Sequence, residues 1–279
     1  MLFTLKSIYE YHKRKVAEKK LIYIFILIII IILLILIITL SCTLTKNKLK
    51  KKPPSYYFNL SNWEFQSPIR SESNILIISP DELTKGYSSK YFYTAKDYSM
   101  AFMCPLNGAH TPNTNYPRSE LREVRQNGDW NLTEGIHILK CKFKVIKTPH
   151  KSVFVGQVHG NDENFNTNLV KIKWTYNNEI DVQVNLDTEN YNQISLLFGQ
   201  YNLGEEISYI IKINDGYLQV SIINYIENEK NILTNGTMFK DPYWNKQKYY
   251  FKAGNYLAGY SDSSDHSIVQ FYYLNIEHQ

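Results

Sequence analysis

Between residues 55 and 279 the sequence alternates repeatedly between apolar and polar residues, and this period of two restricts the fold more than any other feature. Leu139, Cys141, Phe143 and Val145, for example, are separated from one another by single lysines. Successive side chains of a β-strand point to opposite faces of a sheet, so such a segment predicts a strand with one buried face. The same alternation occurs in further segments, at residues 154–158, 180–185, 207–214, 217–224 and 266–276.

These strands belong to one domain, residues 55–279, because no second linker and no internal repeat interrupts them. Asn214, Asp215 and Gly216 lie between two of the segments and predict a tight hairpin turn. The domain has no long segment with the period of an α-helix. Many short strands separated by turn residues predict an all-β domain, which is a sandwich, a jelly roll or a barrel.

Residues 21–40 form an apolar run that contains no charged residue. About 20 helical residues span roughly 30 Å, the thickness of a bilayer core, so we expect a transmembrane helix that acts as a signal-anchor. A cleaved signal, with Cys42 at a lipoprotein-like position, is the alternative. A basic segment at residues 1–20 precedes the run, and a basic linker at residues 41–54 follows it. We expect this linker to be extended towards its two prolines.

Lysines flank the apolar run on both sides, so the positive-inside rule gives no clear orientation. An apolar segment near the N-terminus with a large domain behind it still favours translocation of that domain. We therefore expect an extracytoplasmic domain, anchored in the membrane or, alternatively, secreted after signal cleavage.

The cysteines and the net charge exclude few functions. Cys104 and Cys141 could form a disulfide in a translocated domain, but Cys141 lies on an apolar strand face, which is typical of a buried free thiol. The sequence contains no Cys/His cluster of the kind that predicts a structural metal site. The chain has 31 Lys and Arg against 26 Asp and Glu, and the resulting net charge of +5 favours an anionic partner only weakly. We expect no nucleic-acid ligand.

Three strand-like segments place polar side chains on one face by the same period of two. They contribute Arg118, Glu120 and Arg122; Gln157 and His159; and Tyr250, Lys252, Gly254 and Tyr256. Taken separately, each is as well explained by ion pairs or polar residues on a solvated face, which stabilise little. On one sheet they would form a surface that neutralises an anionic polymer and moves protons.

In order, the three segments read Arg-Ser-Glu-Leu-Arg at 118–122, Gln-Val-His at 157–159 and Tyr-Phe-Lys-Ala-Gly-Asn-Tyr at 250–256. They resemble the three signatures of the alginate lyases of polysaccharide lyase family 7, and the resemblance extends from about residue 56 to the C-terminus. It implies a β-sandwich jelly roll of two antiparallel sheets with a concave substrate groove. It also implies a monomeric catalytic domain that cleaves alginate by β-elimination without a cofactor or metal. Leu257-Ala258 departs from the family's usual Asn-Gln, which leaves subsite preference open.

The resemblance and the chemistry together suggest roles for the catalytic residues. Arg118 or Arg122, with the Gln157 amide, would neutralise the carboxylate next to C5 and so allow loss of the C5 proton. His159, with a pKa near 6.5, would take that proton, and Tyr256 would protonate the leaving oxygen. A nearby cation could lower the pKa of Tyr256 and let it act as the base too. Mannuronate, whose H5 and O4 lie on one side, suits Tyr256 alone, whereas guluronate suits His159 as base.

The remaining signature residues are expected to bind substrate. These are Arg122, Glu120, Lys252 and Tyr250, with Glu120 also expected to hold an arginine in place. The family associates valine in the middle of the second signature, here Val158, with mannuronate preference.

Two other functions remain open from the sequence. A lyase for glucuronan or another polyuronate would need the same neutralisation of a C5 carboxylate. A membrane-displayed jelly roll that binds polysaccharide without cleaving it would keep the arginines but would not need both His159 and Tyr256.

Overall fold

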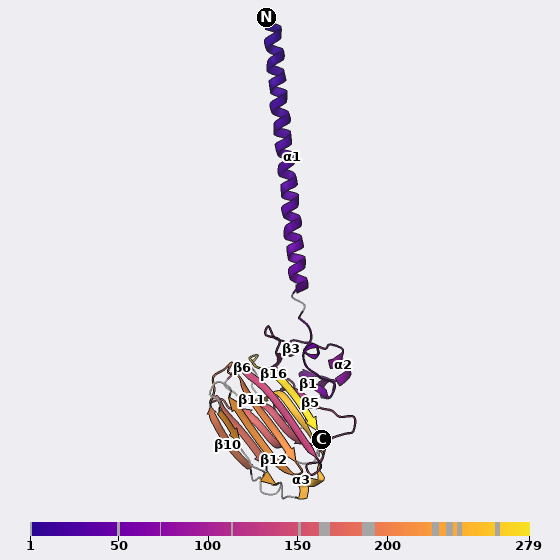
Figure 1. Ribbon diagram of the computed structural model, residues 1–279, viewed down its shortest axis with the longest axis vertical. Coiled ribbons are helices and arrows are strands. Elements are labelled where there is room, and N and C mark those ends of the chain that lie inside the picture. Colours follow the sequence, from indigo (N-terminus) through magenta and orange to yellow (C-terminus); the bar gives the residue numbers. More distant parts are fainter. Residues whose placement is uncertain are drawn as a thin grey trace. The chain divides into compact units, whose positions relative to one another are not determined.

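The structure is a computed structural model that describes residues 2–48, 51–72, 74–112, 114–149, 152–161, 168–185, 193–224, 229–232, 237–238, 242–259 and 263–279. The chain divides into two compact units, Met1–Lys51 and Lys52–Gln279 (Figure 1). The first contains one long helix, and the second contains two β-sheets and short helices.

Helix α1 spans Leu2–Lys48, and its part Tyr9–Ser41 is long and apolar enough to cross a membrane. The side chains described there are exposed. The expectation of an extended linker is wrong for residues 45–48, which continue the helix. Lysine is a good helix former, and the prolines that exclude a helix lie only at Pro53 and Pro54.

The second unit is a sandwich of two antiparallel sheets, as predicted (Figure 1). The first sheet, sheet A, has the strand order β10-β9-β8-β7-β15-β5-β1-β2. The bounds are β1 Trp63–Arg70, β2 Ile75–Ile78, β5 Arg118–Glu123, β7 Ser152–Gly160, β8 Asn168–Trp174, β9 Glu179–Asn185, β10 Gln193–Gln200 and β15 Tyr249–Ala258.

The second sheet, sheet B, has the order β13-β12-β11-β6-β16-β4-β3, and β14 pairs with β12 beside this path. The bounds are β3 Phe92–Thr94, β4 Met100–Pro105, β6 Ile136–Lys147, β11 Ile207–Asn214, β12 Tyr217–Asn224, β13 Glu229–Ile232, β14 Thr237–Met238 and β16 His266–His278. Three short helices complete the unit: η1 Pro54–Tyr56, α2 Pro80–Thr84 and α3 Pro242–Lys246.

The core lies between the two sheets and is formed by the alternate residues that the sequence identifies. On β6 the side chains of Leu139, Phe143 and Val145 are completely buried, whereas the lysines between them are not. The predicted hairpin is confirmed, because Asn214 pairs with Tyr217 across the turn between β11 and β12. Burial on this scale, at about 25 cal/mol per Å² of apolar surface, is the main stabilising contribution to such a fold.

Cys104 and Cys141 are both free and buried. They lie on β4 and β6, which are separated by β16 in sheet B. Burial raises the pKa of both thiols, so the structure shows two inert core residues rather than a disulfide.

The C-terminal end of β16 also links the two sheets. His278 donates through Nε2 to the Glu123 carboxylate of β5 at 2.6 Å. The same carboxylate accepts hydrogen bonds from the Trp130 indole at 3.1 Å and from the Phe251 backbone at 2.9 Å. Glu123 is therefore a buried but well-partnered residue on the core side of sheet A.

Candidate active site

The three polar segments lie on three adjacent strands, β5, β15 and β7, in the middle of sheet A. On one side of β15, Lys252 pairs with Arg122 and Tyr256 pairs with Arg118. On the other side, Tyr250 pairs with His159 and Lys252 also pairs with Gln157. The structure thus brings together all the residues that the sequence singled out.

These side chains point to the outer face of sheet A because the residues between them point into the core. Leu121, Val158 and Phe251 are the intervening residues of the three strands, and each is completely buried. The alternation that builds the core therefore also determines which residues form the site.

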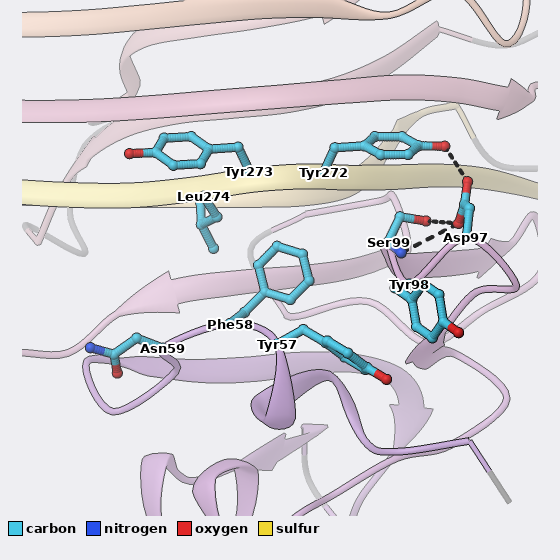
Figure 2. A pocket seen from close by; sticks show the side chains of 9 residues that line it. All are labelled: Tyr57, Phe58, Asn59, Asp97, Tyr98, Ser99, Tyr272, Tyr273 and Leu274. Atoms are coloured by element: carbon cyan, nitrogen blue, oxygen red, sulfur yellow. Dashed lines mark hydrogen bonds between the residues drawn. The ribbon is translucent and has the colours of Figure 1, made fainter.

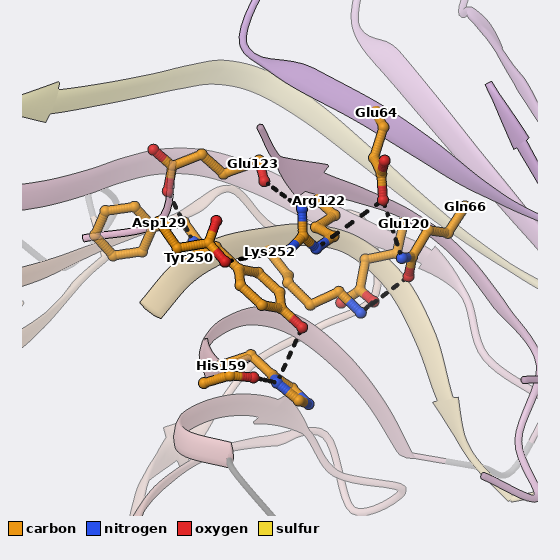
Figure 3. A network of polar contacts seen from close by, with 11 residues as sticks. Glu64, Gln66, Glu120, Arg122, Glu123, Asp129, His159, Tyr250 and Lys252 are labelled. Carbon is orange, nitrogen blue, oxygen red and sulfur yellow. Dashed lines mark hydrogen bonds and ion pairs between the residues drawn. The ribbon is translucent and has the colours of Figure 1, made fainter. Parts of the chain in front are cut away.

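A buried ion pair lies at the centre of the site. Lys252 Nζ is 2.6 Å from Glu120 Oε2 (Figure 3). The Gln157 amide donates to Glu120 Oε1 at 2.5 Å. Lys252 also donates to the Gln66 side-chain oxygen at 3.1 Å. Burial lowers the pKa of Lys252 to about 8, although the charge of Glu120 opposes the shift.

The expected role of Glu120 is wrong in one respect. Its ion-pair and hydrogen-bond partners are Lys252 and Gln157, not an arginine. Glu120 is fully buried and Lys252 is 2% exposed. The pair instead fixes the orientation of the Gln157 amide on the outer face of the sheet.

Arg122 is held by several neighbours. Its guanidinium lies 3.4 Å from Asp129 and 4.0 Å from Glu64, and donates to the Glu123 backbone oxygen at 3.1 Å (Figure 3). It also lies over the Tyr250 ring, with 3.8 Å between the guanidinium carbon and the ring centroid. A cation–π contact of this kind further restricts the guanidinium.

Arg118 is far less engaged by the protein. It donates to the Thr114 hydroxyl at 2.9 Å and lies over the Tyr256 ring, 4.3 Å from the centroid. Its Nε is buried and has no hydrogen-bond partner within the described part of the chain. A buried donor without a partner is rare in proteins, and it distinguishes Arg118 from Arg122.

His159 is a neutral imidazole with a defined tautomer. Its Nδ1 lies 2.6 Å from the Gly160 carbonyl oxygen and 3.1 Å from the Tyr250 hydroxyl. Because a carbonyl oxygen only accepts, Nδ1 carries the proton and Nε2 carries the lone pair. Burial, together with the charge of Lys252, lowers the pKa of His159 to about 3, well below the 6.5 that the sequence suggested.

Tyr256 is protonated at neutral pH. Burial raises its pKa, and the neighbouring Arg118 opposes the shift without reversing it. The expectation that a cation lowers the pKa of Tyr256 is therefore wrong for the protein without substrate. Its ring lies 5.4 Å from that of Phe154 and 6.5 Å from that of Tyr116, which fixes its position beside Arg118.

Four residues of this network were not predicted. Glu64 and Gln66 lie two positions apart on β1, so the period of two could have identified them. Asp129 and Thr114 belong to loops, where no periodicity indicates which side chain turns back towards the sheet. Within the described residues, no group of three or more His, Cys, Asp and Glu side chains could hold a metal ion.

Comparisons with known proteins agree with this geometry. The family model Alginate_lyase2, described as alginate lyase, matches residues 58–278. A curated alginate lyase from Klebsiella pneumoniae is 38% identical over 88 residues, which cover 30% of this chain and 29% of that protein. The local sequence match therefore spans less than a third of this relative.

Solved structures match over a much larger part of the chain. A variant of the family 7 alginate lyase A1-II′ with one Tyr replaced by Phe, in complex with its product GGG, has a TM-score of 0.72 at 31% identity, covering 82% of this chain and all of that one. A variant of that enzyme with one His replaced by Asn and one Tyr by Phe, in complex with substrate GGMG, has a TM-score of 0.71 at 30% identity, covering 82% and 97%. An alginate lyase from Pseudomonas aeruginosa has a TM-score of 0.68 at 27% identity, covering 80% and 100%.

The family model covers most of the chain, and the structural matches cover nearly all of the sandwich. The chain belongs to the alginate lyases of polysaccharide lyase family 7.

Proposed function

We propose that the sandwich domain cleaves alginate by β-elimination and leaves an unsaturated uronate at the new chain end. The observation that carries this proposal is the pairing of β5, β15 and β7. It places Arg118 opposite Tyr256 and places Gln157 and His159 on the neighbouring strand of the same face. These are the residue types needed to neutralise a carboxylate, accept a proton and donate one.

The reaction needs only the groups of the site and the substrate. The C5–H bond breaks, its electrons form the C4=C5 double bond, and the C4–O4 bond breaks with protonation of the leaving oxygen. Arg118, whose Nε lacks a protein partner, and the Gln157 amide would bind the C5 carboxylate and stabilise the enolate-like charge. The fixed tautomer of His159 presents Nε2 as the base, and protonated Tyr256 is the proton donor.

A base with a pKa of about 3 is weak, but substrate binding changes its surroundings. The positive charges of Lys252, Arg118 and Arg122 contribute to the low pKa of His159. A bound polyuronate would offset these charges and thereby raise the pKa towards a value useful for proton transfer. For mannuronate, in which H5 and O4 share a side, Tyr256 could serve as both base and acid, and Val158 is the family feature that favours mannuronate.

A direct assay tests this function. The full chain, purified in detergent, is incubated with polymannuronate, polyguluronate and glucuronan, and ultraviolet absorbance reports the new C4=C5 double bond. We expect the absorbance to rise fastest with polymannuronate, and Tyr256→Phe to reduce the rate by at least about 100-fold. Tyr176→Phe, an exposed tyrosine outside the site, is the matched control. No rise with any polymer would refute lyase activity and favour a binding module, and a rise with glucuronan alone would favour that polymer.

We further propose that α1 anchors the domain to a membrane, with the domain outside the cytoplasm. The length and apolar composition of Tyr9–Ser41 support this proposal. A secreted enzyme with a cleaved signal is the competing possibility, and the N-terminal sequence of the mature protein distinguishes the two.

A further inference from the structure

A pocket with four tyrosines in its lining is formed by residues outside the three signature segments. It has a volume of about 320 Å³ and is formed by three segments that converge beside sheet B (Figure 2). We call it the tyrosine pocket, and its lining residues are Tyr57, Phe58, Asn59, Asp97, Tyr98, Ser99, Tyr272, Tyr273 and Leu274. Its volume is at the lower end of the range for ligand sites, about 300–1,000 Å³.

The pocket combines exposed aromatic rings with polar groups. Tyr57, Tyr98 and Tyr273 are 40%, 64% and 48% exposed, and the rings of Tyr57 and Tyr98 contact each other with centroids 5.3 Å apart. Asn59 and Asp97, which also line the pocket, supply an amide and a carboxylate. Flat rings that cover a C–H surface, beside a few groups that bond hydroxyls, suit a sugar.

Tyr98 occupies a backbone position that ordinarily belongs to glycine. In the turn between β3 and β4, the backbone N–H of Tyr98 donates to the carbonyl oxygen of Ala95, and the backbone N–H of Ala95 donates to the carbonyl oxygen of Ser99. The φ of Tyr98 is 66°. This is a three-residue hairpin loop whose last position is left-handed, where glycine is favoured. A bulky residue there is strained, and such strain is concentrated at functional sites.

Other hairpins of the same chain use favourable residues at such positions. The turn between β8 and β9 has the same pair of backbone hydrogen bonds, and its left-handed residue is Asn178, with a φ of 63°. The turn between β11 and β12 uses Asp215 and Gly216. Asn, Asp and Gly tolerate this conformation, whereas an aromatic residue does not, so Tyr98 has no conformational advantage at its position.

Hydrogen bonds fix the pocket's polar side. The Asp97 carboxylate accepts from the Ser99 hydroxyl at 2.6 Å and from the Tyr272 hydroxyl at 2.5 Å (Figure 2). Burial acts to raise the pKa of Asp97, but these hydrogen bonds outweigh it and lower the pKa. Asp97 is therefore ionised at neutral pH. Tyr272 and the turn that carries Tyr98 are thus held by one carboxylate.

The charge of the pocket distinguishes its ligand from alginate. Among the nine residues that line the pocket, Asp97 is the charged one. Lys144 lies nearby, with its Nζ 4.7 Å from the centroid of the Tyr272 ring, but it also pairs with Glu206. The outer face of sheet A instead presents Arg118 and Arg122. An ionised Asp97 repels a uronate and accepts hydrogen bonds from sugar hydroxyls.

We propose that the tyrosine pocket is a second carbohydrate site, which binds an uncharged hexose unit of a neutral polysaccharide. This site goes beyond the proposed lyase function and does not depend on it. It would hold the enzyme on a neutral glycan while the other sheet acts on the anionic one.

Calorimetric titration of the full chain tests the proposal, in a detergent without sugar head groups. The probes are cellohexaose, mannohexaose and hexamannuronate, with Tyr256→Phe as the background to prevent cleavage. We expect a neutral hexamer to bind with a Kd on the order of 1 mM. Tyr98→Gly should weaken this binding by at least about fivefold, the equivalent of one lost aromatic contact. Tyr176→Ala, in the β8–β9 turn, should bind like the parent.

The same variants separate a ligand role for Tyr98 from a structural one. Because glycine removes the strain at φ 66°, Tyr98→Gly should keep or raise the Tm and leave alginate cleavage unchanged. A fall in Tm would show that Tyr98 serves the fold and would overturn the proposal. Failure of both neutral hexamers to bind, equal binding by Tyr98→Gly, or tighter binding of hexamannuronate in a Tyr98-dependent way would overturn it as well.

Discussion

Arg118 and Arg122 lie four residues apart on one strand, yet their guanidinium groups differ in how many protein groups they contact. Arg122 contacts two carboxylates, a backbone oxygen and the Tyr250 ring. Arg118 contacts one hydroxyl and one ring, and its Nε has no partner among the described residues. The difference comes from Glu64 on β1, Tyr250 on β15 and the loop residues Asp129 and Thr114, so the alternation along β5 alone left the two arginines equivalent.

Substitution of each arginine should therefore have a different effect. Arg118→Ala should reduce kcat/KM by about 100- to 1,000-fold with little change in Tm, because it removes a donor to developing charge. Arg122→Ala should lower the free energy of unfolding by about 1–3 kcal/mol, because Asp129 and Glu64 lose their shared cation. Steady-state kinetics and urea unfolding of both variants provide the measurement. Equal kinetic losses with equal stability would contradict the assignment of Arg118 to the substrate.

His159 should make stability depend on pH in a defined window. Its pKa is about 3 when folded and near 6.5 when unfolded, so below pH 6.5 the unfolded chain binds a proton that the folded protein does not. Stability from this group is complete above pH 6.5 and falls as the pH drops towards 3, by at most about 1.4 kcal/mol per pH unit. Urea unfolding of the wild type and His159→Asn between about pH 7 and 4 should show a shallower fall in the variant. Parallel curves would show that His159 is not a buried neutral imidazole.

At the scale of the strand, β15 carries the third signature between the other two, and its backbone approaches β5 closely. A Cβ atom on Gly254 would lie 2.7 Å from the Glu120 Cα, and the φ of Gly254 is 153°. The pairing of β15 with β7 is also irregular between Ala253 and Tyr256. Glycine at this position therefore allows Lys252 and Tyr256 to face the same side while the strand bends.

Gly254→Ala should push β15 away from β5. We expect a loss of at least about 2 kcal/mol in the free energy of unfolding and a loss of activity, because a backbone contact cannot rotate away. Gly204→Ala is a matched control: its φ is also positive, at 84°, but nothing lies within 4 Å of the added Cβ. This control should lose only about 1 kcal/mol and keep its activity. If both variants behave alike, the close approach to Glu120 has no consequence for the site.

The strands, and the sheet face on which each residue lies, could be predicted from the sequence. Which strands lie side by side in a sheet could not. The period of two identified the buried side of β6 and the polar side of β5. It could not show that β15 lies between β7 and β5, because strand order depends on packing of segments far apart in the chain. For the same reason Glu120 was expected beside an arginine, whereas its partners Gln157 and Lys252 come from the two strands on one side of β5.

At the scale of the whole molecule, every residue of the candidate site belongs to the unit Lys52–Gln279. A chain that begins at Lys52 should therefore fold and keep its kcat/KM on a short oligouronate within about twofold, because the core and the site are complete without the helix. Circular dichroism and the ultraviolet assay on this truncated chain provide the measurement. The matched comparison is the full chain in detergent. A truncated chain that folds but lacks activity would show that residues 1–51 contribute to catalysis.

The position of β16 has a consequence for the way the protein is made. This strand lies inside sheet B between β6 and β4, and its His278 bonds to Glu123 of the other sheet. It follows every other strand of the sandwich in the chain, so neither sheet B nor the link between the sheets can be completed before β16 has been synthesised. Helix α1 precedes every strand of the sandwich, so it is synthesised while the two sheets are still incomplete.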